Sequence, residues 1–286
     1  TGDFIVTHNT TLSCLFAQRL YESGFRVLFV SMETPPQGAL PRDPRHRVID
    51  RVCIRCGLED APADRVCHGA QTPRQRLTIR FDAIGARVSM WRLLRGELNP
   101  HEEWRLREYY RALEDAELHG WGSLRVVAAP VVSSVNDLEI EILEYRPDLV
   151  IWDSAYLAAR PTGKKRQIEA AAELVIDLKL MLERTSVPCL CTWHFNRDVT
   201  EKDDDASQGN AALTDEVGKA GDVLIGMFRP PKTRLANEAI FRTMKVRDGQ
   251  FMRKLTTKWQ LVDTTAFDEL PPDAEADAPS KEGTKK

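Results

Sequence analysis

The stretch DLVIWD, residues Asp148–Asp153, decides the fold that this sequence predicts. Its four central apolar residues have the length and continuous hydrophobicity of a β-strand that is buried on both faces. Two other runs have the same character, RVLFVSM at Arg26–Met32 and VPCLCT at Val187–Thr192. Segments of helical period separate these runs, at Val135–Tyr145 and Lys165–Arg184. Strands that alternate with helices predict an α/β fold whose mainly parallel sheet is covered by helices on both faces.

The regions on either side of this core complete the predicted organisation. We expect a helix at Thr11–Ser23, helices between Arg74 and Gly120 that break near Gly96 and Pro100, a short strand at Leu124–Ala128, a short helix at Thr214–Ala220, and strands at Val223–Phe228, Ala239–Lys245 and Phe251–Trp259. Residues 35–73 are rich in Pro, Arg and Cys without a sustained period, which indicates a small Cys-rich insertion. Residues 268–286 are rich in Pro, Ala and charge, so we expect a disordered tail.

The composition bounds the class of protein. The chain has 286 residues, 42% hydrophobic and 29% charged, as in a soluble globular domain. Its net charge of −3 provides no global basic field, so any DNA contact has to come from a local patch. No apolar run approaches the ~18 residues of a membrane span, and no signal peptide opens the chain. The six cysteines favour a reducing, cytoplasmic compartment over a disulfide scaffold. Cys14, Cys189 and Cys191 lie in apolar runs and are expected in the core.

Polar residues stand where three of the predicted strands end. Glu33 follows RVLFVSM, Asp153 ends DLVIWD, and TWHFNR at Thr192–Arg197 follows VPCLC. Parallel α/β sheets bind ligands at the carboxyl ends of their strands, so these residues are expected to meet at one edge. An apolar strand that ends in Asp is the Walker B pattern, in which the carboxylate holds Mg²⁺. By itself that pattern more often marks a strand that runs into a turn.

Six stretches of the sequence support a nucleotide-binding fold, because their order and spacing match those of a known family. They are VLFVSMET, ARVSMWRLLRGELNPHEEW, DLVIWDSAYL, VPCLCTWHFNRDV, GKAGDVLIGMFR and MKVRDG. Together they resemble the motor domain of DnaB-like replicative helicases over roughly residues 10–35 and 74–262. The resemblance implies a RecA-like fold for residues 10–267, a homo-hexameric ring, and translocation along single-stranded DNA driven by hydrolysis of ATP with Mg²⁺.

The resemblance also implies roles for particular residues. Glu33 corresponds to the base that activates the attacking water, and Asp153 to the Walker B carboxylate. His194 stands where the family usually has the Gln that senses the γ-phosphate. Lys245 and Arg247, in KVRDG, stand where the family has basic fingers that reach the nucleotide of the neighbouring subunit. The alternative for these two is a solvated strand edge.

The phosphate-binding loop departs from the family pattern. Such a loop reads G-x-x-x-x-G-K-[ST], but here TGDFIVTHN precedes Thr10 and Thr11, which begin the expected helix and would belong to the nucleotide site. Residues 1–9 resemble the C-terminal end of an intein, a hydrophobic strand followed by His-Asn and a hydroxyl residue. His8 would then polarise the bond after Asn9, Asn9 would cyclise, and the Thr10 hydroxyl would accept the transferred segment. We therefore expect a larger precursor of a phage-type helicase, in which an upstream segment carries the P-loop.

The insertion contains a set of metal-ligand residues. Cys53 and Cys56 form a CxxC pair, and Cys67, His46 and His68 lie nearby in sequence. One CxxC with a further Cys and a His can complete a tetrahedral Zn²⁺ site. We therefore predict a zinc knuckle, with His46 and His68 both open as the fourth ligand.

Contacts with DNA are expected from the segment after the third apolar strand. Arg197, Lys202 and Lys219 are the candidate DNA-binding residues, although DVTEKDDDASQGN around two of them is acidic. Two alternatives to a helicase remain open. One is a RecA-like recombination or repair ATPase that does not unwind DNA, and the other is an inactive, zinc-containing scaffold.

Overall fold

The computed structural model describes residues 3–32, 73–129, 131–160, 166–193, 216–228, 238–249, 255–259 and 267–269. Its helices are α1 (Asp3–Glu22), α2 (Pro73–Ala86), α3 (Met90–Arg95), α4 (Pro100–Glu114), α5 (Val135–Tyr145), α6 (Gln167–Thr185) and α7 (Glu216–Ala220), with a 3-10 turn at Ala155–Ala158. Its strands are β1 (Arg26–Ser31), β2 (Ser123–Ala128), β3 (Leu149–Asp153), β4 (Cys189–Cys191), β5 (Val223–Phe228), β6 (Glu238–Val246), β7 (Leu255–Trp259) and β8 (Phe267–Glu269).

The predicted parallel sheet is confirmed as a four-stranded sheet of order β2-β1-β3-β4. Its register pairs Ser31 at the end of β1 with Asp153 at the end of β3, and Trp152 with Cys191 at the end of β4. The carboxyl ends of these strands therefore lie at one edge of the sheet, as the sequence predicts.

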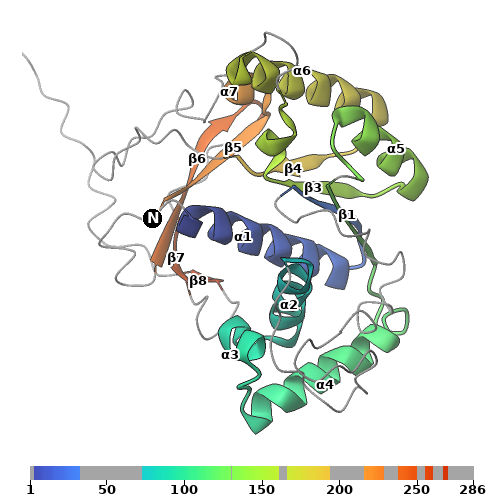
Figure 1. Cartoon of the computed structure of the whole chain (residues 1–286), viewed down its shortest axis with the longest axis vertical. Helices are drawn as coiled ribbons and strands as arrows, with labels where there is room; N and C mark the ends of the chain where they lie inside the picture. The colour runs from blue at the N-terminus through green and yellow to red at the C-terminus, as the bar shows by residue number, and fades with distance from the viewer. Residues whose placement is uncertain are drawn as a thin grey trace, which may run out of the picture.

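Helices cover both faces of this sheet (Figure 1). Side chains alternate between the faces of a strand, and β1 follows this rule. Val27 and Phe29 join one core cluster with side chains of α1, α2 and α4. Leu28 and Val30 join a second cluster with side chains of α5 and α6. The continuous apolar run at β1 thus reflects a strand that is buried on two sides.

The predicted break near Gly96 and Pro100 is built from local capping. Gly96 ends α3 with a left-handed φ of 69°, a conformation that favours glycine. Asn99 then caps α4, where its side chain accepts from the Glu102 N–H and Glu102 accepts from the Asn99 N–H. Burial acts to raise the pKa of Glu102, but its hydrogen bonds with Asn99, Arg92 and Ser89 outweigh this and lower that pKa.

A second sheet, of order β5-β6-β7-β8, is antiparallel throughout. The sequence located three of these strands but not their direction, since a mainly parallel sheet was expected. Too few residues connect β5 to β6 for a crossover helix, and a short connection joins antiparallel strands. Strand β8 also extends two residues into the predicted disordered tail, at Asp268 and Glu269. The remainder of that tail and the insertion at 35–73 lie outside the described residues.

Helix α1 begins earlier than the sequence predicts. The expected start is Thr11, after a strand-like intein end, whereas the backbone of residues 3–9 forms the first turns of the helix. Once a helix is nucleated, each added residue gains a hydrogen bond, so the amphipathic segment that follows can extend backwards. Within the ranges described above, no helix has both the length and the apolar character that crossing a membrane requires.

Candidate functional site

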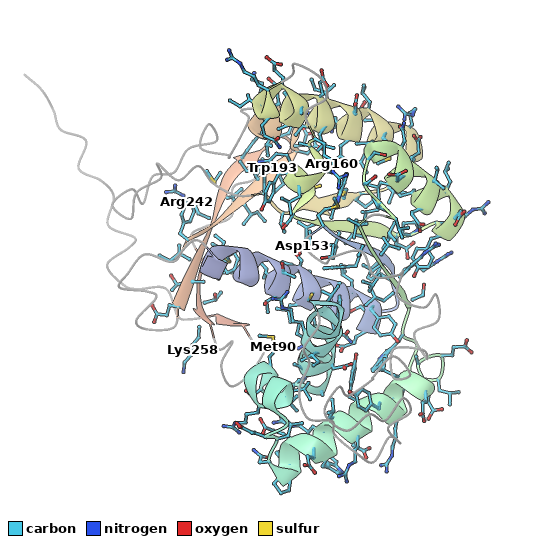
Figure 2. All side chains as sticks on the ribbon, viewed as in Figure 1. Met90, Asp153, Arg160, Trp193, Arg242 and Lys258 are labelled. Atoms are coloured by element: carbon cyan, nitrogen blue, oxygen red, sulfur yellow. The ribbon has the colours of Figure 1, made fainter. Side chains whose placement is uncertain are left out.

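The buried carboxylate of Asp153 lies at the centre of the candidate site (Figure 2). Its Oδ1 accepts a hydrogen bond from the Ser13 hydroxyl of α1 at 3.2 Å and from the Thr192 hydroxyl at 3.0 Å. Thr192 is the first residue after β4. The carboxylate is thus fixed by one residue from helix α1 and one that directly follows the neighbouring strand β4, which restricts its rotation.

Thr192 also fixes the backbone that follows Asp153. Its Oγ1 accepts a hydrogen bond from the Ser154 N–H at 2.7 Å while its hydroxyl donates to Asp153. Ser154 has a left-handed φ of 60°, which is strained for a residue with a Cβ. The relay from backbone N–H to hydroxyl to carboxylate therefore stabilises a strained turn directly beside the carboxylate.

Helix α1 carries three buried hydroxyl side chains, one of which contacts the carboxylate. Thr10, Thr11 and Ser13 are 2%, 3% and 1% exposed, and the predicted nucleotide-site residues Thr10 and Thr11 are therefore inside the protein. Thr10 and Ser13 are three residues apart and share one face of the helix. Because Ser13 contacts Asp153, that face of α1 is turned towards the carboxylate. The sequence predicted Thr10 and Thr11 at the site but missed Ser13, for which three-residue spacing from Thr10 was the available signal.

The donor set at this edge suits a hard cation. Carboxylate and hydroxyl oxygens are the protein ligands that Mg²⁺ prefers, and Asp153 with Thr10 would supply both. Glu33 and His194 lie outside the described residues, each next to a described one. The Met32 N–H, directly before Glu33, donates to the Asp153 carbonyl at 3.2 Å, and the Thr192 N–H donates to the Trp152 carbonyl at 3.1 Å. The described residues that precede Glu33 and His194 are therefore hydrogen-bonded to the end of β3, which carries Asp153.

An aromatic pair joins the segments that follow β3 and β4. Tyr156 and Trp193 meet edge to face with ring centroids 6.0 Å apart. Trp193 also packs against the core cluster beneath α5 and α6. The turn after Asp153 and the segment after Thr192 are thus connected by ring packing as well as by the hydroxyl relay.

Lys245 and Arg247 lie at the end of β6, where they bind the C-terminus of α7. The Lys245 Nζ donates to the carbonyls of Gly218 and Lys219, at 2.7 and 2.9 Å. Arg247 donates to the Lys219 carbonyl at 3.0 Å and pairs with Asp222 at 3.0 Å. These contacts are the ones expected of cations at a helix C-terminus, where carbonyls lack partners within the helix. The predicted finger residues are therefore engaged within the chain.

Asp222 connects this cluster to α6. Its Oδ2 pairs with Lys179 at 2.8 Å, and its Oδ1 pairs with Arg247. The hydrogen bond from Lys179 is the main reason why the pKa of Asp222 is lowered, with further contributions from the charges of Lys179, Arg247 and Lys245. The carboxylate remains 58% exposed, so solvent screens these pairs.

The remaining predicted site residues are not brought to this edge by the described part of the structure. Lys219 is exposed on α7 and pairs with Glu216 at 2.6 Å. Arg197 and Lys202 lie outside the described residues, as do the zinc candidates His46, Cys53, Cys56, Cys67 and His68. Within the part that is described, no group of three or more His, Cys, Asp or Glu could hold a metal ion. His8 and Asn9 lie within helix α1. The zinc, DNA and splicing assignments stay predictions.

No protein-family model and no curated protein matches the chain. Among solved structures, "The Structure Of A DnaB-Like Replicative Helicase And Its Interactions With Primase" has a TM-score of 0.59 and 13% identity, and covers 88% of this chain. This chain spans 58% of that one. A structure described as an ATPase domain has the same TM-score and identity, over 88% of this chain and 86% of the other. A KaiC-like protein from Pyrococcus horikoshii has a TM-score of 0.39 at 12% identity, over 87% and 90% of the two chains. At such identities the first two likenesses show the fold alone, which is a RecA-like α/β fold.

Proposed function

We propose that the chain is the motor part of an ATP-driven DNA helicase or translocase of the DnaB-like type, which acts on single-stranded DNA as a homo-hexameric ring. The observation that carries this proposal is the buried Asp153 at the carboxyl edge, held by Ser13 and Thr192. Positioning a carboxylate at the end of a buried parallel strand is what Mg²⁺–nucleotide binding requires. The likeness in fold to a structure described as a DnaB-like replicative helicase supports the same choice.

The proposed roles divide between binding and hydrolysis. Asp153 and the Thr10 hydroxyl would hold Mg²⁺, which when bound neutralises charge on the phosphates. Glu33 would accept a proton from the attacking water, and His194 would hydrogen-bond the γ-phosphate. Lys245 and Arg247 would stabilise charge on the nucleotide of the adjacent subunit, for which their contacts with α7 and Asp222 would have to open.

The glycines and lysine of a P-loop do not precede Thr10 in this sequence. We propose that an upstream precursor segment supplies them and that His8, Asn9 and Thr10 carry out the splicing step that joins the two. In the spliced product the residue before Thr10 would be the P-loop lysine. The buried position of Thr10 at the site edge fits that arrangement.

The test is to place G-x-x-x-x-G-K directly before Thr10 and to compare this restored protein with the unmodified chain. The restored protein should hydrolyse ATP, respond to single-stranded DNA and unwind a forked duplex, while the given chain should bind ATP weakly. Hydrolysis without unwinding would support the recombination or repair ATPase instead. A lack of hydrolysis in a folded, restored protein would support the inactive scaffold.

The zinc proposal has a separate test. A polar insertion of this size buries little apolar surface, and a metal ion would supply the missing folding free energy. Freshly reduced protein should contain one Zn²⁺ per chain, and Cys53→Ser should lose it. His46→Ala and His68→Ala, compared with each other, would identify the fourth ligand. Absence of zinc from the reduced protein would return these cysteines to ordinary packing.

A further inference from the structure

Two thiols lie in contact on the last strand of the parallel sheet. The Sγ atoms of Cys189 and Cys191 are 3.5 Å apart and share a hydrogen bond. The two residues are separated by one position in β4, so their side chains leave the same face of the strand. Both are partly buried free cysteines that pack against the core beneath α5 and α6. The third described free cysteine, Cys14, is completely buried in the other core cluster.

We propose that Cys189 and Cys191 form a reversible dithiol–disulfide pair, which is a modification site for oxidants that react by thiol–disulfide exchange. A parallel strand rises ~3.3 Å per residue, which places the two Cα atoms ~6.6 Å apart. Disulfides span Cα separations of ~4.4–6.8 Å and Cβ separations of ~3.5–4.5 Å, so a bridge here requires the strand to bend, and the resulting strain makes the bond easy to reduce. Strained disulfides belong to the labile class and not to the structural class.

The exchange can be written with its atoms and electrons balanced. The Cys191 thiolate attacks one sulfur of glutathione disulfide, forms a mixed disulfide and releases one glutathione thiolate. The Cys189 thiolate then attacks the Cys191 sulfur, closes the internal bridge and releases the second glutathione. The protein loses two electrons and two protons, and the disulfide of the oxidant becomes two thiols.

The local chemistry gives this exchange an order and a pH dependence. The hydrogen bond with Cys191, followed by burial, raises the pKa of Cys189 well above its ordinary value. The Cys189 thiolate is therefore disfavoured, which places Cys189 in the closing step of the exchange. Closure of the bridge needs the Cys189 thiolate, so its rate should rise with pH across the alkaline range.

The pair is coupled directly to the Asp153 site. Cys191 precedes Thr192, whose hydroxyl donates to Asp153 and accepts from the Ser154 N–H. The strand also pairs Cys191 with Trp152, directly before Asp153. A bridge draws the two Cα atoms together, shortens β4 and displaces Thr192 from the carboxylate. Oxidation should therefore weaken the hydrogen bonds that Thr192 makes around Asp153. Only the effect of oxidation on ATP hydrolysis rests on the proposed function.

The experiment uses the full chain in a series of glutathione buffers, followed by acid quenching, alkylation and peptide mass analysis. Trypsin releases the segment Thr185–Arg197, in which Cys189 and Cys191 are the two cysteines. In oxidising buffers this peptide should lose two hydrogens and resist alkylation, and reduced glutathione should reverse the change. Cys14→Ser should behave as the parent, and Cys191→Ser should form no internal bridge. A peptide that stays fully alkylated, or carries glutathione adducts without the bridge, would overturn the proposal.

A second measurement tests the coupling without relying on ATP hydrolysis. The thermal midpoint of the oxidised chain should be lower than that of the reduced chain, because a bridge across so short a loop adds strain and little loop-closure entropy. Cys189→Ala and Cys191→Ser should each remove the difference. A bridge that forms without lowering the midpoint would overturn the displacement of Thr192. Failure of the restored protein to hydrolyse ATP would leave both results intact.

Discussion

Two aspartates of this chain are held in opposite ways. Asp153 is fully buried at the end of β3 and accepts hydrogen bonds from the neutral hydroxyls of Ser13 and Thr192. Asp222 is exposed before β5 and pairs with the cations Lys179 and Arg247. The first aspartate is thus held by hydroxyls inside the protein, and the second by cations at its surface.

This difference indicates which of the two aspartates is the better candidate for binding a ligand. Asp153 is buried at the carboxyl edge of the parallel sheet, which is where α/β folds bind their ligands, and the hydroxyls of Ser13 and Thr192 hold it there. Asp222 is exposed before β5, and screening by solvent makes its pairs with Lys179 and Arg247 weak. We therefore propose a functional role for Asp153 and a structural role for Asp222, and four measurements test this proposal.

The largest effect is expected from Asp153→Asn in the protein with a restored P-loop. Asn keeps the size of the side chain and an oxygen that accepts from Ser13 and Thr192, but it removes the charge that would hold Mg²⁺. ATP hydrolysis should fall by more than the about 100-fold loss typical of residues that only support a metal ligand. Asp222→Asn is the matched control and should keep most of the activity. Equal activity of the two variants would contradict a functional role for Asp153.

The hydroxyls around Asp153 should have the next largest effect. Thr192→Val and Ser13→Ala each remove one donor and should reduce ATP hydrolysis by about 10–100-fold, with a higher Mg²⁺ requirement. Thr192→Ser keeps the hydroxyl and should recover most of the activity at the original Mg²⁺ requirement. Loss of activity in Thr192→Val with an unchanged Mg²⁺ dependence would count against a role through Asp153.

Variants of Arg247 distinguish between two roles for this residue, an arginine finger at the neighbouring subunit and a cap of helix α7. Arg247→Ala and Glu33→Gln proteins should each be inactive alone, and mixing them should restore part of the activity because one interface then has both residues. Lys179→Ala disturbs the same cluster through Asp222 and should keep its activity alone. If Arg247→Ala is as active as Lys179→Ala, then Arg247 acts as the cap of α7 and not as a finger.

The smallest effect is expected from the charge pair itself. The lowered pKa of Asp222 means that its pair with Lys179 contributes stability above the unfolded Asp pKa of about 3.9, and that this stability is lost as the pH falls through the lower folded value. Lys179→Ala should lower the free energy of unfolding at pH 7 by less than about 1 kcal/mol. Denaturant unfolding of parent and variant should then converge below pH ~3.9. A difference that persists in acid would show that Lys179 acts through packing.

Local patterns in the sequence account for much of the fold. The apolar runs at β1, β3 and β4 and the capping signal at Gly96 to Pro100 all lie within short segments, and each was located from the sequence. The direction of the strands in the second sheet was missed, because strand periodicity is the same for parallel and antiparallel neighbours. The start of α1 was also missed, because helix extension depends on the segment that follows.

The position of an aspartate at the end of a buried strand, beside two other polar strand ends, can be predicted from the sequence, because chain direction and apolar length are local features. The identity of the hydroxyls that hold this aspartate depends on the tertiary structure. Ser13 and Thr192 lie 140 and 39 positions from Asp153, and their contacts depend on how far α1 and β4 slide along the sheet. That offset is set by side-chain packing in the two cores, and no local pattern records it.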